Sequence, residues 1–165
     1  MKHTLSVLLR NKPGALSRVT GLFSGRCFNI ESLCVAETFD PQISCLTVVT
    51  SGEAAIIEQI TKQLHKLVDV LKVSDITEGS HIEREIMLVK SRANTPDARD
   101  EVKRLSEIFR GQIVDVTPDL YTVQLVGTSD KLDAFIGTMK QATEIVEVVR
   151  SGVCGIARGE RSLHA

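Results

Sequence analysis

The sequence has no long apolar run and almost no net charge, and these two absences exclude broad classes of protein. Hydrophobic residues make up 42% of the 165-residue chain, but no segment approaches the ~18 uninterrupted apolar residues of a membrane-spanning helix. Twenty basic side chains against twenty-one acidic ones leave a formal net charge of -1, which gives no general attraction for a phosphate backbone. We therefore expect a globular protein that binds neither membrane nor nucleic acid.

Signals for export and for thiol chemistry are also absent. The first ten residues largely alternate polar and apolar side chains and lack the continuous apolar core of a secretory signal, so we expect a cytoplasmic protein. Cysteine occurs four times, at Cys27, Cys34, Cys45 and Cys154, without a C-x-x-C pair. The first three fall in apolar stretches, where a free thiol behaves as a small hydrophobic side chain. This pattern predicts buried structural thiols rather than metal or redox chemistry.

A catalytic constellation is missing as well. Catalysis would need a nucleophile with a base, a carboxylate pair or metal ligands at workable spacing. The histidines, which form no H-x-x-x-H pair, are His3, His65, His81 and His164. The glycine run over 152–159 lacks the G-K-[ST] ending of a P-loop and the spacing of a dinucleotide fingerprint, and it is typical of a flexible terminal loop. We predict no catalytic residue and no metal site.

What the sequence does contain is a repeated order of strand and helix signals. The first half predicts a strand near 4–10, a helix over 15–25, strands over 28–37 and 43–50, a helix over 56–64 capped by Ser51, and a strand over 68–73. The second half predicts a strand over 86–89, a helix after Thr95-Pro96, strands over 113–116 and 120–126, a helix capped by Ser129, and a strand over 145–149. Both halves therefore follow the order β-α-β-β-α-β, and we expect an α+β protein with two tandem ferredoxin-like units at 1–78 and 79–165.

The size of each unit and one of its strands favour self-association. A unit of roughly 75 to 80 residues is near the lower limit of a stable core. The strand over 29–37 carries Leu33 and Val35 on one face, and Ile30 and Cys34 on the other. Two apolar faces in an antiparallel strand need extra cover from a partner chain or from the second unit. We expect a homodimer.

One loop carries specific chemistry, because residues 10–16 join the end of a strand to the start of a helix. A helix N-terminus offers unpaired backbone N–H groups and a partial positive charge, which suit a carboxylate. Gly14 permits close approach, and Asn11 offers both a donor and an acceptor, as a zwitterionic amino acid requires. On spacing alone, an ordinary strand-to-helix turn remains the alternative.

Several segments together resemble a known family. Residues 5–19 are similar to the start of an ACT domain, a βαββαβ module that binds small effectors, usually amino acids. With it, the segments that resemble the acetolactate synthase (acetohydroxyacid synthase) small subunit are 28–33, 62–70, 84–90, 109–113, 121–125 and 150–153. The resemblance spans nearly the whole chain and includes both units.

The resemblance implies a regulatory subunit without an active site or cofactor of its own. Thiamine diphosphate, Mg and FAD would belong to a large catalytic subunit that condenses pyruvate with pyruvate or 2-oxobutyrate. The small subunit would raise the activity of that partner and confer inhibition by valine, or by leucine or isoleucine. In the family the effector lies between ACT domains of two chains. The matching positions are Asn11, Gly14, Ala15 and Leu16 on the loop of one chain, with Asn29 and Ile30 on a strand of the other.

Other interpretations remain open on the residues alone. Asn29 also suits the start of a strand, and Leu16 and Ile30 also suit a core. A small enzyme on a ferredoxin-like scaffold would need the missing acid–base pair, and an amino-acid-sensing transcription regulator would need a helix-turn-helix segment. The second unit is not expected to bind the effector, because its corresponding loop, 91–97, lacks glycine and places Asp97 where it would repel a carboxylate.

Overall fold

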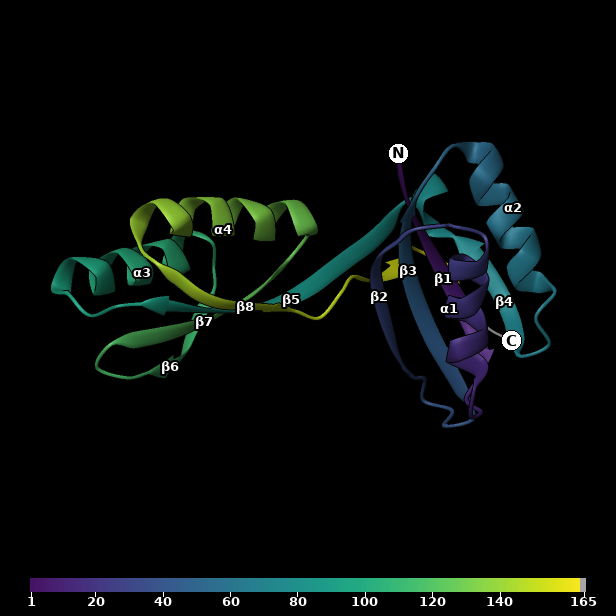
Figure 1. Ribbon diagram of the computed structural model, residues 1–165, viewed down its shortest axis with the longest axis horizontal. Coiled ribbons are helices and arrows are strands. Elements are labelled where there is room, and N and C mark those ends of the chain that lie inside the picture. Colours follow the sequence, from purple (N-terminus) through teal and green to yellow (C-terminus); the bar gives the residue numbers. More distant parts are fainter. Residues whose placement is uncertain (164–165) are drawn as a thin grey trace. The chain divides into compact units, whose positions relative to one another are not determined.

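The computed structural model describes residues 1–163 and divides into two compact units (Figure 1). Unit 1 comprises Met1–Glu83 together with the segment 153–163, and unit 2 comprises Arg84–Gly152. This division differs from the expected one at 78/79, because residues 79–83 and the C-terminal segment pack with the first unit. The last two residues of the expected 79–165 domain lie outside the described residues. No helix within 1–163 is both long and apolar enough to cross a membrane.

Unit 1 is an antiparallel sheet with two helices, in the expected βαββαβ order. Its elements are β1 (Lys2–Arg10), α1 (Ala15–Gly25), β2 (Ile30–Glu37), β3 (Ile43–Ser51), α2 (Ala54–His65), β4 (Val70–Asp75) and the 3-10 turn η1 (Ile76–Glu78). The strand order β2-β3-β1-β4 is that of a ferredoxin-like sheet. It leaves β2 and β4 as the two edge strands.

The termini of the helices in unit 1 follow from local chemistry. Helix α1 begins after Gly14, whose backbone is left-handed with φ 84°, a conformation that glycine adopts at little cost. The predicted cap at Ser51 is wrong, because Ser51 is the last residue of β3 and its hydroxyl donates to Glu31. Helix α2 begins instead after Glu53, which makes no side-chain cap.

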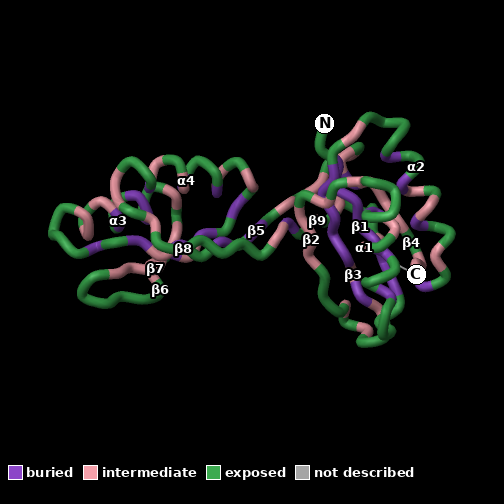
Figure 2. The backbone as a smooth tube through the Cα atoms, in the orientation of Figure 1, coloured by how far each residue is buried: buried purple, intermediate pink, exposed green. Residues whose placement is uncertain are grey.

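The core of unit 1 lies between the helices and one face of the sheet. Its fully buried side chains come from β1, β3, α1 and α2, and the largest are Leu5, Leu46, Phe23, Ile60 and Leu64. The other face of β1 and β3 is also buried (Figure 2). There the side chains of Leu8 and Val49 are 4% and 7% exposed.

The chain's own C-terminal segment supplies part of this second cover. It contains a strand, β9 (Cys154–Ala157), that pairs with β5 (His81–Arg92) and packs near β1, β3 and η1. A Cβ at Gly155 would lie 2.6 Å from Cδ1 of Ile76, so glycine permits the close approach here. The prediction of a flexible loop over 152–159 is therefore wrong, since a long-range strand pairing orders this segment.

The edge strand β2 is less buried than its sequence predicted. Ile30 and Leu33 pack against the core, whereas Val35 is 39% exposed. On the other face, the Ser32 hydroxyl accepts a hydrogen bond of 2.8 Å from the backbone N–H of Val153. Part of the cover that was expected from a partner chain thus comes from the chain's own C-terminal segment. Within residues 1–163, β2 pairs with no strand other than β3, so its outer edge is the part of this strand that a second chain could still pair with.

Unit 2 repeats the plan with the strand order β6-β7-β5-β8. Strand β5 continues into it, and the other elements are α3 (Pro96–Ile108), β6 (Gln112–Val116), β7 (Leu120–Gly127), α4 (Ser129–Ala142) and β8 (Ile145–Arg150). The Thr95 hydroxyl caps α3 by accepting the N–H of Ala98, as predicted. Thr128 rather than Ser129 caps α4. The two sheets confirm the expected α+β architecture of two tandem ferredoxin-like units.

Candidate effector site

Backbone hydrogen bonds connect the predicted loop at the end of β1 to two other segments of unit 1. The N–H of Arg10 donates to the carbonyl of Asp69, and the N–H of Asn11 donates to the carbonyl of Gln42, each at 2.8 Å. The side-chain amide of Asn11 donates to Oε1 of Glu37 at 3.0 Å and to the carbonyl of Pro41 at 2.9 Å. Since an amide group has two N–H donors, both are used, and its carbonyl oxygen remains as an acceptor. Asn11 is exposed, so this oxygen is open to a ligand.

The first turn of α1 follows this loop. The N–H of Ala15 already donates to the carbonyl of Lys12 at 3.1 Å. Within residues 1–163, the N–H groups of Leu16 and Ser17 have no backbone acceptor. Such first-turn N–H groups suit an anion. The Ala15 side chain is buried in the core and can serve a ligand only through its backbone, whereas Leu16 is exposed.

An ion pair that sequence analysis did not identify lies beside Gly14. Nε of Arg18 donates to Oδ2 of Asp69 at 3.0 Å, and Nη2 donates to the same oxygen. A Cβ added at Gly14 would lie 3.0 Å from Nη1 of Arg18. The guanidinium group thus borders the space above Gly14. No local pattern could have revealed this, because the two members of the pair stand 51 positions apart.

Asn29 and Ile30 lie at the other end of the sheet. The carbonyl of Asn29 accepts a 2.6 Å hydrogen bond from the Thr50 hydroxyl, and Ile30 pairs with Thr50, which itself pairs with His3. Asn11 follows the opposite end of β1. At about 3.3 Å per residue, the length of β1 separates the two groups by on the order of 20 Å. One chain therefore does not bring all six predicted residues together, and a site that uses them all requires a second chain.

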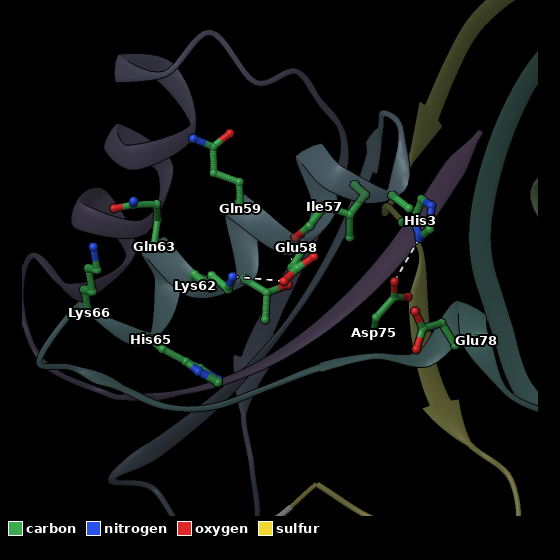
Figure 3. A pocket seen from close by; sticks show the side chains of 12 residues that line it. His3, Ile57, Glu58, Gln59, Lys62, Gln63, His65, Lys66, Asp75 and Glu78 are labelled. Carbon is green, nitrogen blue, oxygen red and sulfur yellow. Dashed lines mark hydrogen bonds and ion pairs between the residues drawn. The ribbon is translucent and has the colours of Figure 1, made fainter.

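Unit 1 has one hollow beside the predicted loop and another that contains none of the six predicted residues. The first, of about 500 Å³, lies beside the loop and is lined by Arg10, Asn11, Lys12, Asp40, Pro41, Gln42, Ile43 and Leu71. The second, of about 900 Å³, runs along α2 and was not predicted (Figure 3). In it, His3 pairs with Asp75 at 2.8 Å, and Lys62 pairs with Glu58 at 2.9 Å. Its charged side chains are of both signs, which gives the groove no preference for a ligand of one charge.

The cysteines and other metal-ligating side chains do not converge. In the described part of the chain, no group of three or more His, Cys, Asp or Glu side chains could hold a metal ion. None of the four cysteines forms a disulfide; Cys34 and Cys45 are half-buried, and Cys27 and Cys154 are exposed. The prediction of buried thiols is therefore wrong for Cys27, which follows α1 with a positive φ of 59°, and for Cys154 on β9.

The fold and the glycine-capped loop place unit 1 in the class of ACT domains, and the comparisons with known proteins agree. Residues 5–72 match the family described as the AHAS small subunit-like ACT domain. Residues 84–159 match the family described as the small subunit of acetolactate synthase. The chain belongs to the acetolactate synthase small subunit family.

Relatives match along almost the full chain. The acetolactate synthase isozyme 3 small subunit of Salmonella typhimurium is 62% identical over 161 residues, which cover 98% of each chain. The acetolactate synthase small subunit of Haemophilus influenzae is 60% identical over 163 residues, which cover 99% of each chain. The crystal structure of the acetolactate synthase small subunit from Thermotoga maritima superposes with a TM-score of 0.88 at 36% identity, covering 98% of this chain and 99% of that one.

Proposed function

We propose that this chain is the non-catalytic regulatory subunit of an acetolactate synthase. It activates a thiamine-diphosphate-dependent catalytic subunit and confers feedback inhibition by valine, or by leucine or isoleucine. The observation that carries the proposal is the match of both units, at 62% identity over 98% of the chain, to a protein named as a small subunit. A small subunit implies a catalytic partner, and in this proposal thiamine diphosphate, Mg and FAD reside there.

The geometry of unit 1 supports an effector site between two copies of the chain. Within residues 1–163, strand β2 pairs with β3 alone, and a sheet edge left unpaired in this way is able to add a strand. If two β2 strands pair antiparallel about a two-fold axis, the Ile30 end of one lies beside the Glu37 end of the other. Asn11 bonds to Glu37 at 3.0 Å. The partner subunit's Asn29 and Ile30 would then approach the loop, and this would unite the six predicted residues.

Such a site has groups for both charges of an amino acid. The carboxylate would accept hydrogen bonds from the N–H groups of Leu16 and Ser17 at the start of α1. The ammonium group would donate to the free carbonyl oxygen of Asn11, and the nearby carboxylate of Glu37 would attract it. The exposed side chain of Leu16 and the partner's Ile30 would contact the branched side chain.

Reconstitution tests the proposal and its main rival. The purified chain alone should not consume pyruvate. Mixed with the catalytic subunit of its own organism, it should raise acetolactate formation and make that activity sensitive to valine, leucine or isoleucine. Turnover of pyruvate by this chain alone would instead support a small enzyme on a ferredoxin-like scaffold. Failure of the mixture to gain either activity or sensitivity would contradict the proposal.

A further inference from the structure

We propose that Arg18, oriented by Asp69, binds the carboxylate of the effector and makes the site select amino acids over uncharged analogues. The inference rests on the proposed function, since it names a specificity-determining residue of the same site. The starting observation is that the Arg18 guanidinium borders the space above Gly14, where the loop permits close approach.

The hydrogen bonds of Arg18 leave one of its nitrogens available. Nε and Nη2 both donate to Oδ2 of Asp69 on one side of the guanidinium. Nη1 is the nitrogen nearest to Gly14, at 3.0 Å from the position of an added Cβ. Because a guanidinium carries five N–H donors, Nη1 is able to donate to a second carboxylate while the Asp69 pair stays intact.

Asp69 fixes both parts of this arrangement. Its carboxylate holds the guanidinium, and its backbone carbonyl accepts the N–H of Arg10 at 2.8 Å, so one residue sets the loop and the cation relative to each other. Asp69 is 7% exposed, whereas the Arg18 side chain is 51% exposed. The buried carboxylate is therefore suited to orient the cation, and the exposed cation is open to a ligand.

A purely structural ion pair is the alternative, and the two roles differ in what they discriminate. A structural pair would stabilise unit 1 and affect every ligand alike. A carboxylate-binding cation would strengthen binding of an amino acid relative to its amide, which keeps the ammonium group and side chain but lacks the carboxylate charge. The ratio of the two affinities thus reports the proposed role and is insensitive to general loss of stability.

The test measures by calorimetry how much more tightly the full chain binds an amino acid than the corresponding amide. The amino acid is valine, leucine or isoleucine, whichever the wild type binds most tightly. Arg18→Gln should lower the preference for the acid by about 10- to 100-fold, the effect of one charged hydrogen bond. In the single variant the buried carboxylate of Asp69 would lose its partner, so a double variant, Arg18→Gln with Asp69→Asn, removes that charge as well. The double variant should lower the preference for the acid by the same factor. Arg104→Gln is the matched control, because Arg104 makes a comparable two-bond pair with Glu101 in unit 2, at 3.2 and 2.8 Å.

The outcomes separate this inference from the proposed function. An unchanged ratio in the double variant, with amino-acid binding lost in Gly14→Asp, would overturn the role of Arg18 and leave the site in place. Failure of the wild type to bind any of the three amino acids would contradict the proposed function and the inference together. A preference for the acid that falls in both Arg18 variants and is unchanged in Arg104→Gln would support the inference. The double variant decides if Arg18→Gln alone does not fold.

Discussion

His81 is a titratable side chain whose two ring nitrogens both have acceptors in unit 1. Nδ1 lies 3.0 Å from the carbonyl of Gly79, and Nε2 lies 2.8 Å from Oε1 of Glu83. The bond to the Gly79 carbonyl, together with Glu83, raises the pKa of His81 above its usual value, although partial burial and Arg161 oppose the shift. Protonated His81 therefore stabilises the folded chain.

The sign of this linkage gives a prediction about pH. Since the folded pKa lies above the unfolded one, the stabilisation is complete below the unfolded value of about 6.5 and is lost as the pH rises through the raised folded value. His81→Gln should therefore lower the melting temperature more at pH 5.5 than at pH 8.5, each relative to wild type. The exposed His65 on α2 supplies the control, His65→Gln. Equal losses at the two pH values would show that protonation of His81 is not coupled to folding.

The residues of the candidate site differ in whether nearby sequence or a distant residue determines their conformation. The turn at Asn11 and Gly14 could be predicted, because a strand end followed by glycine and a helix start is a pattern within a few positions; that these residues bind an effector stays a prediction. Arg18 could not be predicted, because its orientation depends on Asp69, 51 positions away. The cap of α4 was misplaced by one residue, since Thr128 and Ser129 both carry a hydroxyl and only the fold shows that Thr128 accepts the N–H of Lys131.

Among the elements, β2 is the one through which we propose that the chain self-associates. A charge on an unpaired edge strand opposes the addition of another strand. Val35→Lys should therefore weaken dimerisation by about tenfold or more, as measured by sedimentation over a range of concentrations. Ile56→Lys on α2 is a matched control, because Ile56 is 38% exposed and Val35 is 39% exposed. A wild-type chain that is monomeric at micromolar concentration, or a dimer that tolerates Val35→Lys, would contradict pairing through β2.

The spacing of apolar residues was enough to predict most helices and strands, but not all of them. The helices and hairpin strands were predictable because their apolar positions recur at a fixed spacing over many residues. Strand β9 was not, since four residues containing a glycine carry too little pattern. Its strand conformation comes from pairing with β5, which precedes it by more than 60 positions.

For the whole molecule, the C-terminal segment makes unit 1 discontinuous in sequence. Val153 is 4% exposed, and the segment that begins with it packs near the face of β1 and β3 that the helices do not cover. The chain enters and leaves unit 2 at neighbouring points, because the N–H of Ser151 donates to the carbonyl of Ile86 at 3.0 Å. A short linker could therefore replace unit 2 and still join the two segments of unit 1.

Two shortened chains test this organisation. A chain in which a short glycine-serine linker replaces 84–152 should keep the fold of unit 1 and bind the amino acid. A chain that ends at Glu78 loses cover over apolar side chains such as those of Leu8 and Val49. At about 1.5 to 3 kcal/mol for each of these two, it should be less stable by about 3 to 6 kcal/mol. Denaturant unfolding of both chains measures the difference. Equal stability would contradict a structural role for the segment.

In the proposed function, the loop at Gly14 receives the effector and thereby controls a separate catalytic subunit. Replacing Gly14 by Asp adds a side chain where φ is 84° and beside the Arg18 guanidinium, in the space that the effector carboxylate needs. Its negative charge would also repel that carboxylate. Because a ligand shifts a conformational equilibrium only through its differential affinity for the two states, the loss of binding should remove inhibition and spare activation.

Titration of valine, or of leucine or isoleucine if the wild type prefers one of them, against the reconstituted complex of Gly14→Asp with the catalytic subunit tests whether the loop at Gly14 receives the effector. We predict that the complex stays active and that half-inhibition requires at least about 100-fold more amino acid than for the wild type, from the combined loss of space and charged hydrogen bonds. Gly21→Asp is the matched control, because it adds the same charge on α1 at a position where an added Cβ meets no atom within 4 Å other than those of its chain neighbours and of the helix's own backbone. It should leave inhibition unchanged. Wild-type inhibition of a folded Gly14→Asp complex would show that the effector does not bind at this loop.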